Sequence, residues 1–419
     1  MSILIKNVLH SFRNEKTDVF VNNGKIEKIG KNLKVDAEKT IDGTDKILYP
    51  ALSNMHTHAA MVLFKGYADD LQLMEWLQTK IWPIESKLTE EDVYWGTKFA
   101  CLEMIKTGTT LFNDMYWHFD ACYQAVEEMG MRAILNAVMI DMFDIERQKA
   151  NEKRTIEIFE KYYDKNPLIT VGLGPHAVYT VSSKGLKFAA EFRKEKNTFL
   201  HIHLSETLME VEQCLKENGK RPPEYLDELG VLSDKTILAH CIWLNPSEIE
   251  LIAERNCIAV HTPISNMKLA VGGIMPKREL REHNVKICLG TDGAASNNNL
   301  DMTEEMKVAA ILQKWRNNNA EIPNAYDVVF RATEGFRLLG LKVDKLDEGD
   351  NADFILMKIH EIITPVHNPI SNFVYAASGT LTDTVVCNGK ILMENGYVEG
   401  EEEIKENFSK TINKLFNLT

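Results

Sequence analysis

Eight short β-prone apolar runs recur along the middle of the chain, and helical patterns separate most of them. Thr89 and Asp92 form a cap-like helix start, Gly108 follows the end of that helix, and similar helical patterns fill 207–219, 246–255 and 302–315. Strands that alternate with helices favour a parallel sheet, and eight such units are typical of a (β/α)8 barrel. The runs lie at 52–56, 109–114, 132–139, 169–176, 199–206, 236–241, 258–262 and 285–292.

The two ends of the chain differ from the middle and resemble each other. Each carries an Asn-Gly turn between short β-prone runs, Asn23-Gly24 near the start and Asn388-Gly389 near the end. Asn-Gly is a strong hairpin signal, but one hairpin alone is marginally stable in water. The sequence therefore predicts an α/β protein: a (β/α)8 TIM barrel at 51–355, with 61–87 inserted over its mouth, and a composite β-sandwich domain from 1–50 and 356–419.

Composition narrows the class of protein. The chain has 48 Lys and Arg against 61 Asp and Glu, a net charge of −13, which argues against a nucleic-acid partner. Its apolar runs are too short to cross a bilayer, and its start lacks a secretory signal pattern, so we expect a cytoplasmic enzyme with no membrane partner. The seven cysteines are scattered without C-x-x-C spacing, which favours buried reduced thiols over disulfides or a thiolate zinc site.

Polar side chains stand where the predicted strands end. In a TIM barrel the carboxyl ends of the strands meet at one mouth, where the active site lies. Five histidines and two carboxylates occupy these positions, although they are far apart in the sequence. They are His56, His58, His176, His203, Glu206, His240 and Asp292.

A subset of these residues predicts a metal site. His56 and His58 are two residues apart on an extended segment, so both imidazoles face the same side. His203 and Asp292 would add a third imidazole and an anionic oxygen. Three imidazoles and a carboxylate, with one open position, suit Zn²⁺ or a similar first-row ion used in catalysis. His201, one layer deeper, is expected to support a ligand rather than to be one.

Two further residues could complete the chemistry around a divalent ion, which lowers the pKa of water from 15.7 to about 7. Glu206 could move protons, although a carboxylate at the start of a helix is also favoured by the helix dipole. His240 could stabilise a negative oxygen, although a buried, hydrogen-bonded histidine is the ordinary alternative. The signals of P-loops, dinucleotide sites, serine elbows and the H-x-E with P-C-x-x-C deaminases are absent from the sequence.

The motifs around these positions resemble the amidohydrolase superfamily. Within it they are most similar to the 5′-methylthioadenosine/S-adenosylhomocysteine deaminase family. The resemblance covers essentially the whole chain and is specific as a set. It rests on PALSNMHTH at 50–58, HIHLSE at 201–206, LAHC at 238–241, HTPISNMKLA at 261–270 and LGTDGAASNN at 289–298.

The resemblance implies hydrolytic deamination at C6 of adenosine-type nucleosides that are modified at the 5′ position. It implies one divalent ion per subunit, with Zn²⁺ favoured, held by His56, His58, His203 and Asp292. Glu206 would protonate N1 of the purine, His240 would stand beside the nucleophile, and Asp292 would help to deprotonate the attacking water; Glu206 and Asp292 therefore also contact the substrate. The same barrel serves relatives that act on guanine, other aminated heterocycles or chlorinated triazines, and these stay as alternatives.

Three other residues bear on the substrate through the resemblance. Glu85 matches a carboxylate that grips the ribose hydroxyls, His176 a contact near the ribose and purine, and Arg147 one of two arginines that hold a homocysteine carboxylate. The second arginine is missing at 135–137, and Arg132 lies slightly upstream. Methylthioadenosine, 5′-deoxyadenosine and adenosine are therefore equal or better candidates than S-adenosylhomocysteine. The sequence does not set the oligomeric state, although symmetric homo-oligomers are common.

Overall fold

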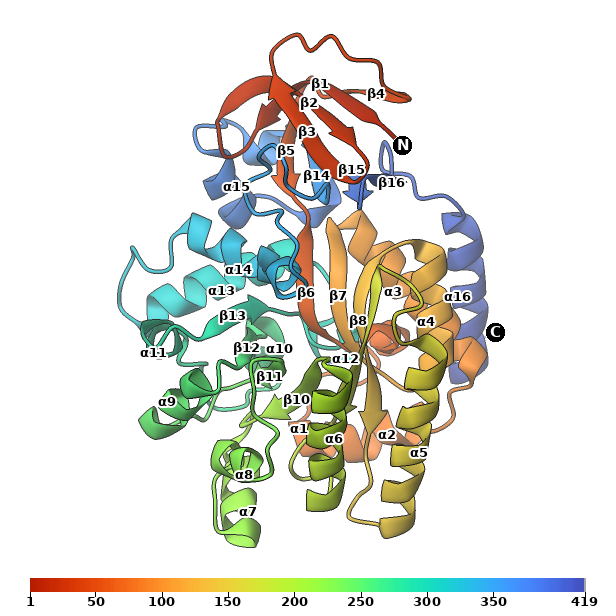
Figure 1. Cartoon of the computed structure of the whole chain (residues 1–419), viewed down its shortest axis with the longest axis vertical. Helices are drawn as coiled ribbons and strands as arrows, with labels where there is room; N and C mark the ends of the chain where they lie inside the picture. The colour runs from red at the N-terminus through yellow and green to blue at the C-terminus, as the bar shows by residue number, and fades with distance from the viewer. Residues whose placement is uncertain (418–419) are drawn as a thin grey trace.

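The eight predicted runs form one parallel sheet that curls into a barrel (Figure 1). The computed structural model describes residues 1–417. Each barrel strand pairs in parallel with the next one along the chain, so the TIM-like fold is confirmed. The strands are β6 (Leu52–Thr57), β7 (Thr109–Met115), β8 (Arg132–Met139), β9 (Ile169–Pro175), β10 (Leu200–Leu204), β11 (Thr236–His240), β12 (Ile258–His261) and β13 (Lys286–Leu289).

The first and last barrel strands meet through the residues that follow β13. The backbone N–H of Asp292 donates to the carbonyl of His56 at 2.9 Å, and the N–H of Thr291 donates to Asn54 Oδ1 at 2.9 Å. Gly290 permits this approach, because a Cβ there would lie 2.7 Å from the backbone nitrogen of His56. The near-closure of the barrel thus brings together residues from opposite ends of the barrel sequence.

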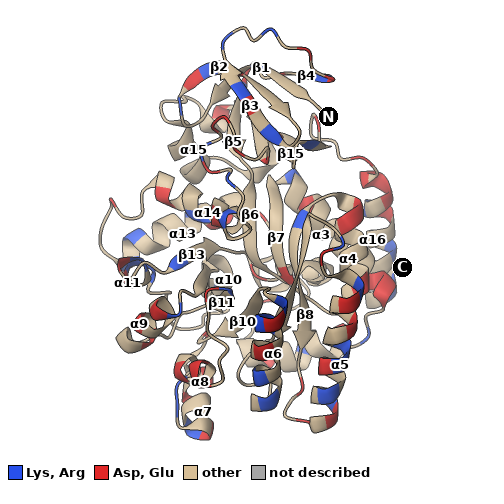
Figure 2. Cartoon of the chain, in the orientation of Figure 1, with Lys and Arg blue, Asp and Glu red and all other residues tan. Residues whose placement is uncertain are grey.

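Helices surround the barrel, and several start and stop where the sequence signals lie. Thr89 and Asp92 form a reciprocal capping box before α3, Thr207 caps α7, and Gly219 ends α7 with a φ of +68°. Charges of both signs are interleaved on the outer helices α5 and α6 (Figure 2). The helices are α3 (Glu90–Lys106), α4 (Phe119–Met129), α5 (Ile145–Tyr162), α6 (Ser183–Lys196), α7 (Leu208–Asn218), α8 (Pro222–Glu228), α9 (Pro246–Glu254), α10 (Pro263–Lys268), α11 (Lys277–Glu282), α12 (Ala294–Asn297), α13 (Met302–Arg316) and α14 (Ala325–Leu338).

Strands from both termini form a second, mostly antiparallel sheet, as the two hairpin signals predict. It is a single connected sheet in the order β16-β15-β14-β5-β1-β2-β3, with β4 beside β1. The two Asn-Gly turns lie against each other, because a Cβ on Gly389 would approach the Cα of Gly24 to 2.8 Å. The strands are β1 (Ile3–His10), β2 (Glu15–Asn22), β3 (Lys25–Gly30), β4 (Lys39–Asp42), β5 (Lys46–Pro50), β14 (Phe354–Lys358), β15 (Thr382–Cys387) and β16 (Lys390–Met393).

The terminal sheet lies at the end of the barrel where the strands begin (Figure 1). Arg132, the first residue of β8, donates to Asp353 Oδ1 at 2.9 Å and to Asn388 Oδ1 at 2.8 Å, and both partners belong to this region. The carboxyl ends of the barrel strands therefore open on the opposite side of the molecule.

The last helix, α16 (Glu401–Phe416), lies along α3 of the barrel rather than on the terminal sheet (Figure 1). The rings of Phe408 and Phe99 stack with their centroids 3.8 Å apart. The predicted domain boundary at residue 356 falls inside β14 (Phe354–Lys358). We keep the division into a barrel and a composite terminal domain as a proposal, with α16 as the segment that ties the two together.

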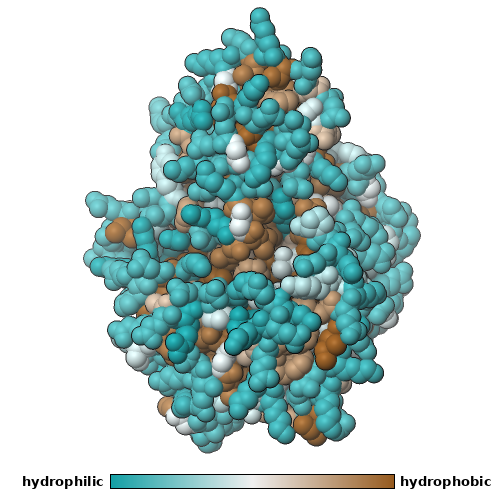
Figure 3. Space-filling view, in the orientation of Figure 1, coloured by the Kyte–Doolittle hydropathy of each residue, from teal (hydrophilic) through white to brown (hydrophobic). Residues whose placement is uncertain are grey.

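Apolar side chains form one large core around the barrel strands and two smaller clusters, one in the terminal sheet and one beneath the insertion. The face shown in Figure 3 is mostly hydrophilic, with apolar side chains near its centre. All seven cysteines are buried and free. In residues 1–417 no helix combines the length and apolar character that a membrane span requires.

The insertion contains η1 (Ala59–Phe64), α1 (Leu73–Trp76), the π-helix η2 (Leu77–Ile81) and α2 (Trp82–Glu85). The remaining short helices are η3 (Glu361–Ile363), α15 (Pro369–Tyr375) and η4 (Gly379–Leu381).

Candidate active site

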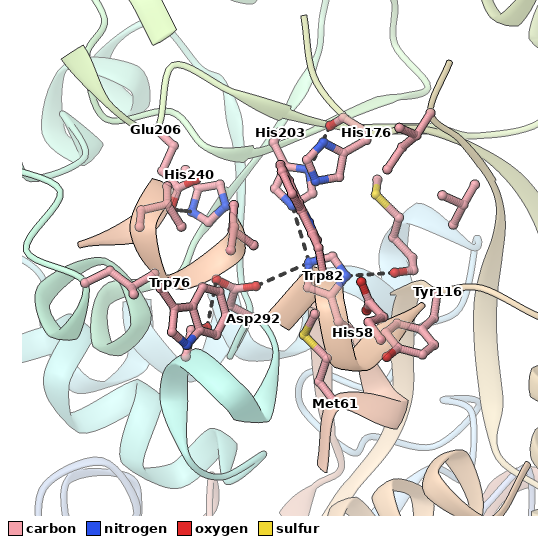
Figure 4. Close-up of a pocket in the computed structure, with 18 of the residues that line it drawn as sticks. His58, Met61, Trp76, Trp82, Tyr116, His176, His203, Glu206, His240 and Asp292 are labelled. Carbon is pink, nitrogen blue, oxygen red and sulfur yellow. Dashed lines mark hydrogen bonds and ion pairs between the residues drawn. The ribbon is translucent and has the colours of Figure 1, made fainter. Parts of the chain in front are cut away.

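Three histidines and one aspartate converge at the mouth of the barrel. Figure 4 shows three of them, His58, His203 and Asp292. Asp292 Oδ1 lies 3.3 Å from His56 Nε2 and 3.4 Å from His58 Nε2. His203 Nε2 lies 3.3 Å from His58 Nε2. The structure thus brings the four residues that the sequence suggests as ligands into one cluster.

Hydrogen bonds fix the tautomers of two of these histidines. His58 Nδ1 lies 2.7 Å from the carbonyl of Met115, and His203 Nδ1 lies 2.7 Å from the carbonyl of His176. Carbonyl oxygens only accept, so the proton of each ring is on Nδ1. Each Nε2 therefore directs a lone pair toward the centre of the cluster.

His56 adopts the same tautomer, with its proton on Nδ1, through a hydrogen bond to His201. His201 Nδ1 donates to the carbonyl of Ile237 at 3.1 Å, which leaves its Nε2 to accept from His56 Nδ1 at 2.7 Å. His56 Nε2 is then a lone-pair donor that is fully buried and without a hydrogen-bond partner among the described residues. Burial lowers the pKa of His56, His201 and His203, so all three imidazoles are neutral.

The donor set fits a divalent cation. Three imidazoles present their Nε2 atoms to one space, and Asp292 adds one negative charge. Burial acts to raise the pKa of Asp292, but the neighbouring imidazoles, that of His56 above all, outweigh it and hold the pKa well below the usual value. Ser265 donates to Asp292 Oδ2 at 2.6 Å and the N–H of Gly293 to Oδ1 at 2.7 Å, which fixes the orientation of the carboxylate.

The supporting role of His201 gives a testable prediction. We expect His201→Ala to weaken metal affinity by about 10- to 100-fold, because His56 loses the acceptor that sets its tautomer. The measurement is competition for the metal against a chromophoric chelator. His261→Ala is the matched control, since His261 is also a buried histidine at a strand end but hydrogen-bonds only Gln313. Equal metal affinity in the two variants would contradict the assignment.

Glu206 and His240 flank the cluster (Figure 4). Glu206 Oε1 lies 3.8 Å from His240 Nδ1, and the Asn266 side-chain amide donates to the same Nδ1 at 2.9 Å, so the proton of His240 is on Nε2. Burial, and then the charges of Asp292 and Glu210, raise the pKa of Glu206 well above its usual value. Burial therefore favours the protonated form of the Glu206 carboxyl.

Unusual backbone conformations direct these side chains. Ser205, His240 and Asp292 adopt left-handed φ values of +49°, +72° and +66°, each at or just beyond the end of a strand. Residues other than glycine rarely adopt this conformation, and it turns the chain sharply. The strands β10 and β13 end before Glu206 and Asp292, so both carboxyls stand on loops rather than on the strands that the sequence predicts.

A cavity of about 720 Å³ opens beside the cluster. The insertion at 61–87 covers it, as predicted, with Trp76, Trp82 and Glu85 among its walls. Burial raises the pKa of Glu85, although the Tyr116 hydroxyl opposes the shift. His176 also lines the cavity, and burial lowers its pKa to about 3.

Several lining residues were missed by the sequence reasoning, among them two tyrosines. Tyr116 directly follows β7, so the rule of inspecting strand ends could have found it. Tyr179 lies four residues beyond the end of β9, and no motif points to it.

Arg147 and Arg132, the two arginines considered for substrate binding, lie in different parts of the structure. Arg147 is exposed in the first turn of α5 and lines a neighbouring cavity that shares Trp82, Glu85 and Ile140 with the central one. Arg132 is held by Asp353 at the opposite end of the barrel. The central cavity therefore lacks an arginine among its lining residues, and a substrate-binding role for Arg147 stays a prediction.

Three imidazoles and a carboxylate at the mouth of such a barrel, with the buried acid Glu206 beside them, are typical of a metal-dependent hydrolase. The family comparison agrees with this class: the amidohydrolase family model matches residues 47–392, and the chain belongs to that family.

Individual relatives share most of its length. The chain is 46% identical over 415 residues to a 5′-deoxyadenosine deaminase of Methanoregula boonei, covering 96% of this chain and 92% of the relative. It is 45% identical over 384 residues to the 5-methylthioadenosine/S-adenosylhomocysteine deaminase 1 of Archaeoglobus fulgidus, covering 90% of each. A solved zinc-bound adenosine deaminase from Xanthomonas campestris superimposes with a TM-score of 0.93 at 32% identity, covering 99% of each chain.

Proposed function

We propose that the protein is a zinc-dependent deaminase of adenosine-type nucleosides altered at the 5′ position. The reaction replaces the 6-amino group with oxygen and releases ammonia and the inosine analogue. The observation that carries the proposal is the buried Glu206 beside the ligand cluster and 3.8 Å from His240, in a cavity that also contains Glu85. The names of the relatives support the substrate class.

The ion would be held by His56, His58, His203 and Asp292, and when bound it would supply a water of lowered pKa. The low pKa of Asp292 keeps it as a carboxylate. Asp292 would take a proton from the attacking water and pass it to the 6-amino group, which leaves as ammonia, and the new hydroxyl on C6 would return a proton to Glu206. Glu206 donates its proton to N1 of the purine, which makes C6 more electrophilic. His240 directs its Nε2–H toward the negative oxygen that develops at C6.

The walls of the cavity bear on substrate choice. Glu85 and His176 both line the cavity, and we expect the Glu85 carboxylate to accept hydrogen bonds from two ribose hydroxyls. Met61, Trp76 and Trp82 provide an apolar wall that suits a 5′-methyl or methylthio group. A homocysteine tail would depend on Arg147 alone, so we rank 5′-deoxyadenosine and methylthioadenosine above S-adenosylhomocysteine.

The test is ammonia release by the zinc-loaded enzyme from 5′-deoxyadenosine, methylthioadenosine, S-adenosylhomocysteine, adenosine and guanine. We expect the highest kcat/KM for the first two. Activity on guanine alone would reject the ribose-gripping role of Glu85 and favour the guanine alternative. Reconstitution with Fe²⁺, Co²⁺ or Ni²⁺ in parallel checks the assignment of zinc. Cytoplasmic location and homo-oligomeric assembly stay predictions.

A further inference from the structure

A second buried carboxylate lies behind Glu206. Glu210 is 4% exposed, and its two oxygens accept from the backbone N–H of Ser205 at 2.7 Å and of Glu206 at 2.8 Å. Within residues 1–417, no lysine or arginine nitrogen pairs with Glu210. Burying a carboxylate without a cation is costly, so its two hydrogen bonds to the backbone are what stabilise it there.

Helix capping alone does not account for this arrangement. Glu210 is the third residue of α7, and its own N–H donates to the hydroxyl of the cap residue Thr207 at 3.1 Å. In a capping box the side chain of the third residue bonds the N–H of the cap residue itself. Glu210 instead reaches past Thr207 to the two preceding residues, and one of these is Glu206.

The segment that Glu210 holds is also held from its other side. The carbonyl of Ser205 accepts from the N–H groups of Ile242 and Trp243 at 3.2 and 2.9 Å. These two residues come directly after the turn at His240 and Cys241. Glu210 thus holds the backbone N–H groups of the left-handed turn that directs Glu206 toward His240. The segment that follows β11 holds the carbonyl of the same turn.

We infer that Glu210 is a positioning residue that holds the backbone of Glu206, and so the direction of its side chain, in place for proton transfer. Glu210 is not among the residues that line the substrate cavity. It lines an adjoining cavity, which shares Leu73, Tyr179 and Glu206 with the substrate cavity. The inference rests on the proposed function, because it acts through the proton-transfer role of Glu206.

The first test compares Glu210→Gln and Glu210→Ala. We expect kcat to fall at least about 10-fold in E210A, since small misplacements of a reacting group cost this much or more, while zinc content and KM change little. E210Q loses less, because its amide oxygen can still accept one N–H. Two controls on the same helix keep the native kcat: Thr207→Ala removes the cap hydroxyl, and Glu212→Gln removes an exposed charge. Native kcat in E210A, or equal losses in T207A, would overturn the inference.

The second test combines Glu210→Ala with Glu206→Gln. If Glu210 acts only through Glu206, the double variant is no slower than E206Q alone, whereas independent effects multiply. A double variant slower by the full E210A factor would overturn the inference. Failure of the proposed function has a different signature, native kcat in E206Q itself. If E210A does not fold, the near-isosteric E210Q replaces it in the same cycle.

Discussion

Glu206→Gln lowers kcat by about 10²- to 10⁴-fold and leaves the metal in place, because positioned proton transfer typically contributes that much. Glutamine has nearly the same shape but cannot give its proton to a purine nitrogen. Burial raises the pKa of Glu206 well above its usual value, and exchanging the acid for a neutral amide introduces no new buried charge. We therefore expect the thermal midpoint and the metal content to match the parent protein.

The measurement is ammonia release under saturating nucleoside, with metal analysis of the same sample. Glu334→Gln is the matched control: Glu334 is 7% exposed against 6% for Glu206, and burial raises its pKa as well, but it lies on α14 outside the substrate cavity. E334Q should keep the parent rate. A near-native rate in E206Q would reject Glu206 as the proton donor.

Asp292→Ala is expected to remove both metal and activity. Asp292 is the one anionic residue among the proposed ligands, and it contacts both His56 and His58. Without it, three neutral imidazoles face an uncompensated dication, and the attacking water loses its proton acceptor. Residues that only support ligands already contribute about 10- to 100-fold to metal affinity, so losing the carboxylate should cost at least about 100-fold.

The check is metal retained after dialysis against a chelator, followed by kcat on re-addition of excess zinc. Ser296→Ala is the control, since its hydroxyl reaches Asp292 Oδ2 at a longer 3.3 Å while Ser265 keeps its own hydrogen bond at 2.6 Å. S296A should retain metal. If D292A retained both metal and full turnover, Asp292 would not be a ligand.

Local sequence patterns predicted much of the architecture. Strand and helix periodicity, the Thr89 and Thr207 caps and the two Asn-Gly turns depend on near neighbours, so they can be recognised before any fold is known. The inspection of strand ends located His240 and Glu206 for the same reason. The same inspection did not find Tyr179, because this residue follows β9 by several residues and its position depends on how the loop packs.

The residue types at the strand ends, and hence the chemistry, were determined by the sequence alone. Only the tertiary structure decided which ring nitrogen each histidine presents, since that choice depends on carbonyls such as Met115 and Ile237 from other strands. It also decided that Arg132 binds Asp353 at the end of the barrel where the strands begin, that α16 packs on α3, and that Glu210 accepts a hydrogen bond from the backbone of Glu206. Hydrogen-bond partners and burial arise from contacts between distant segments, and a linear pattern does not contain those distances.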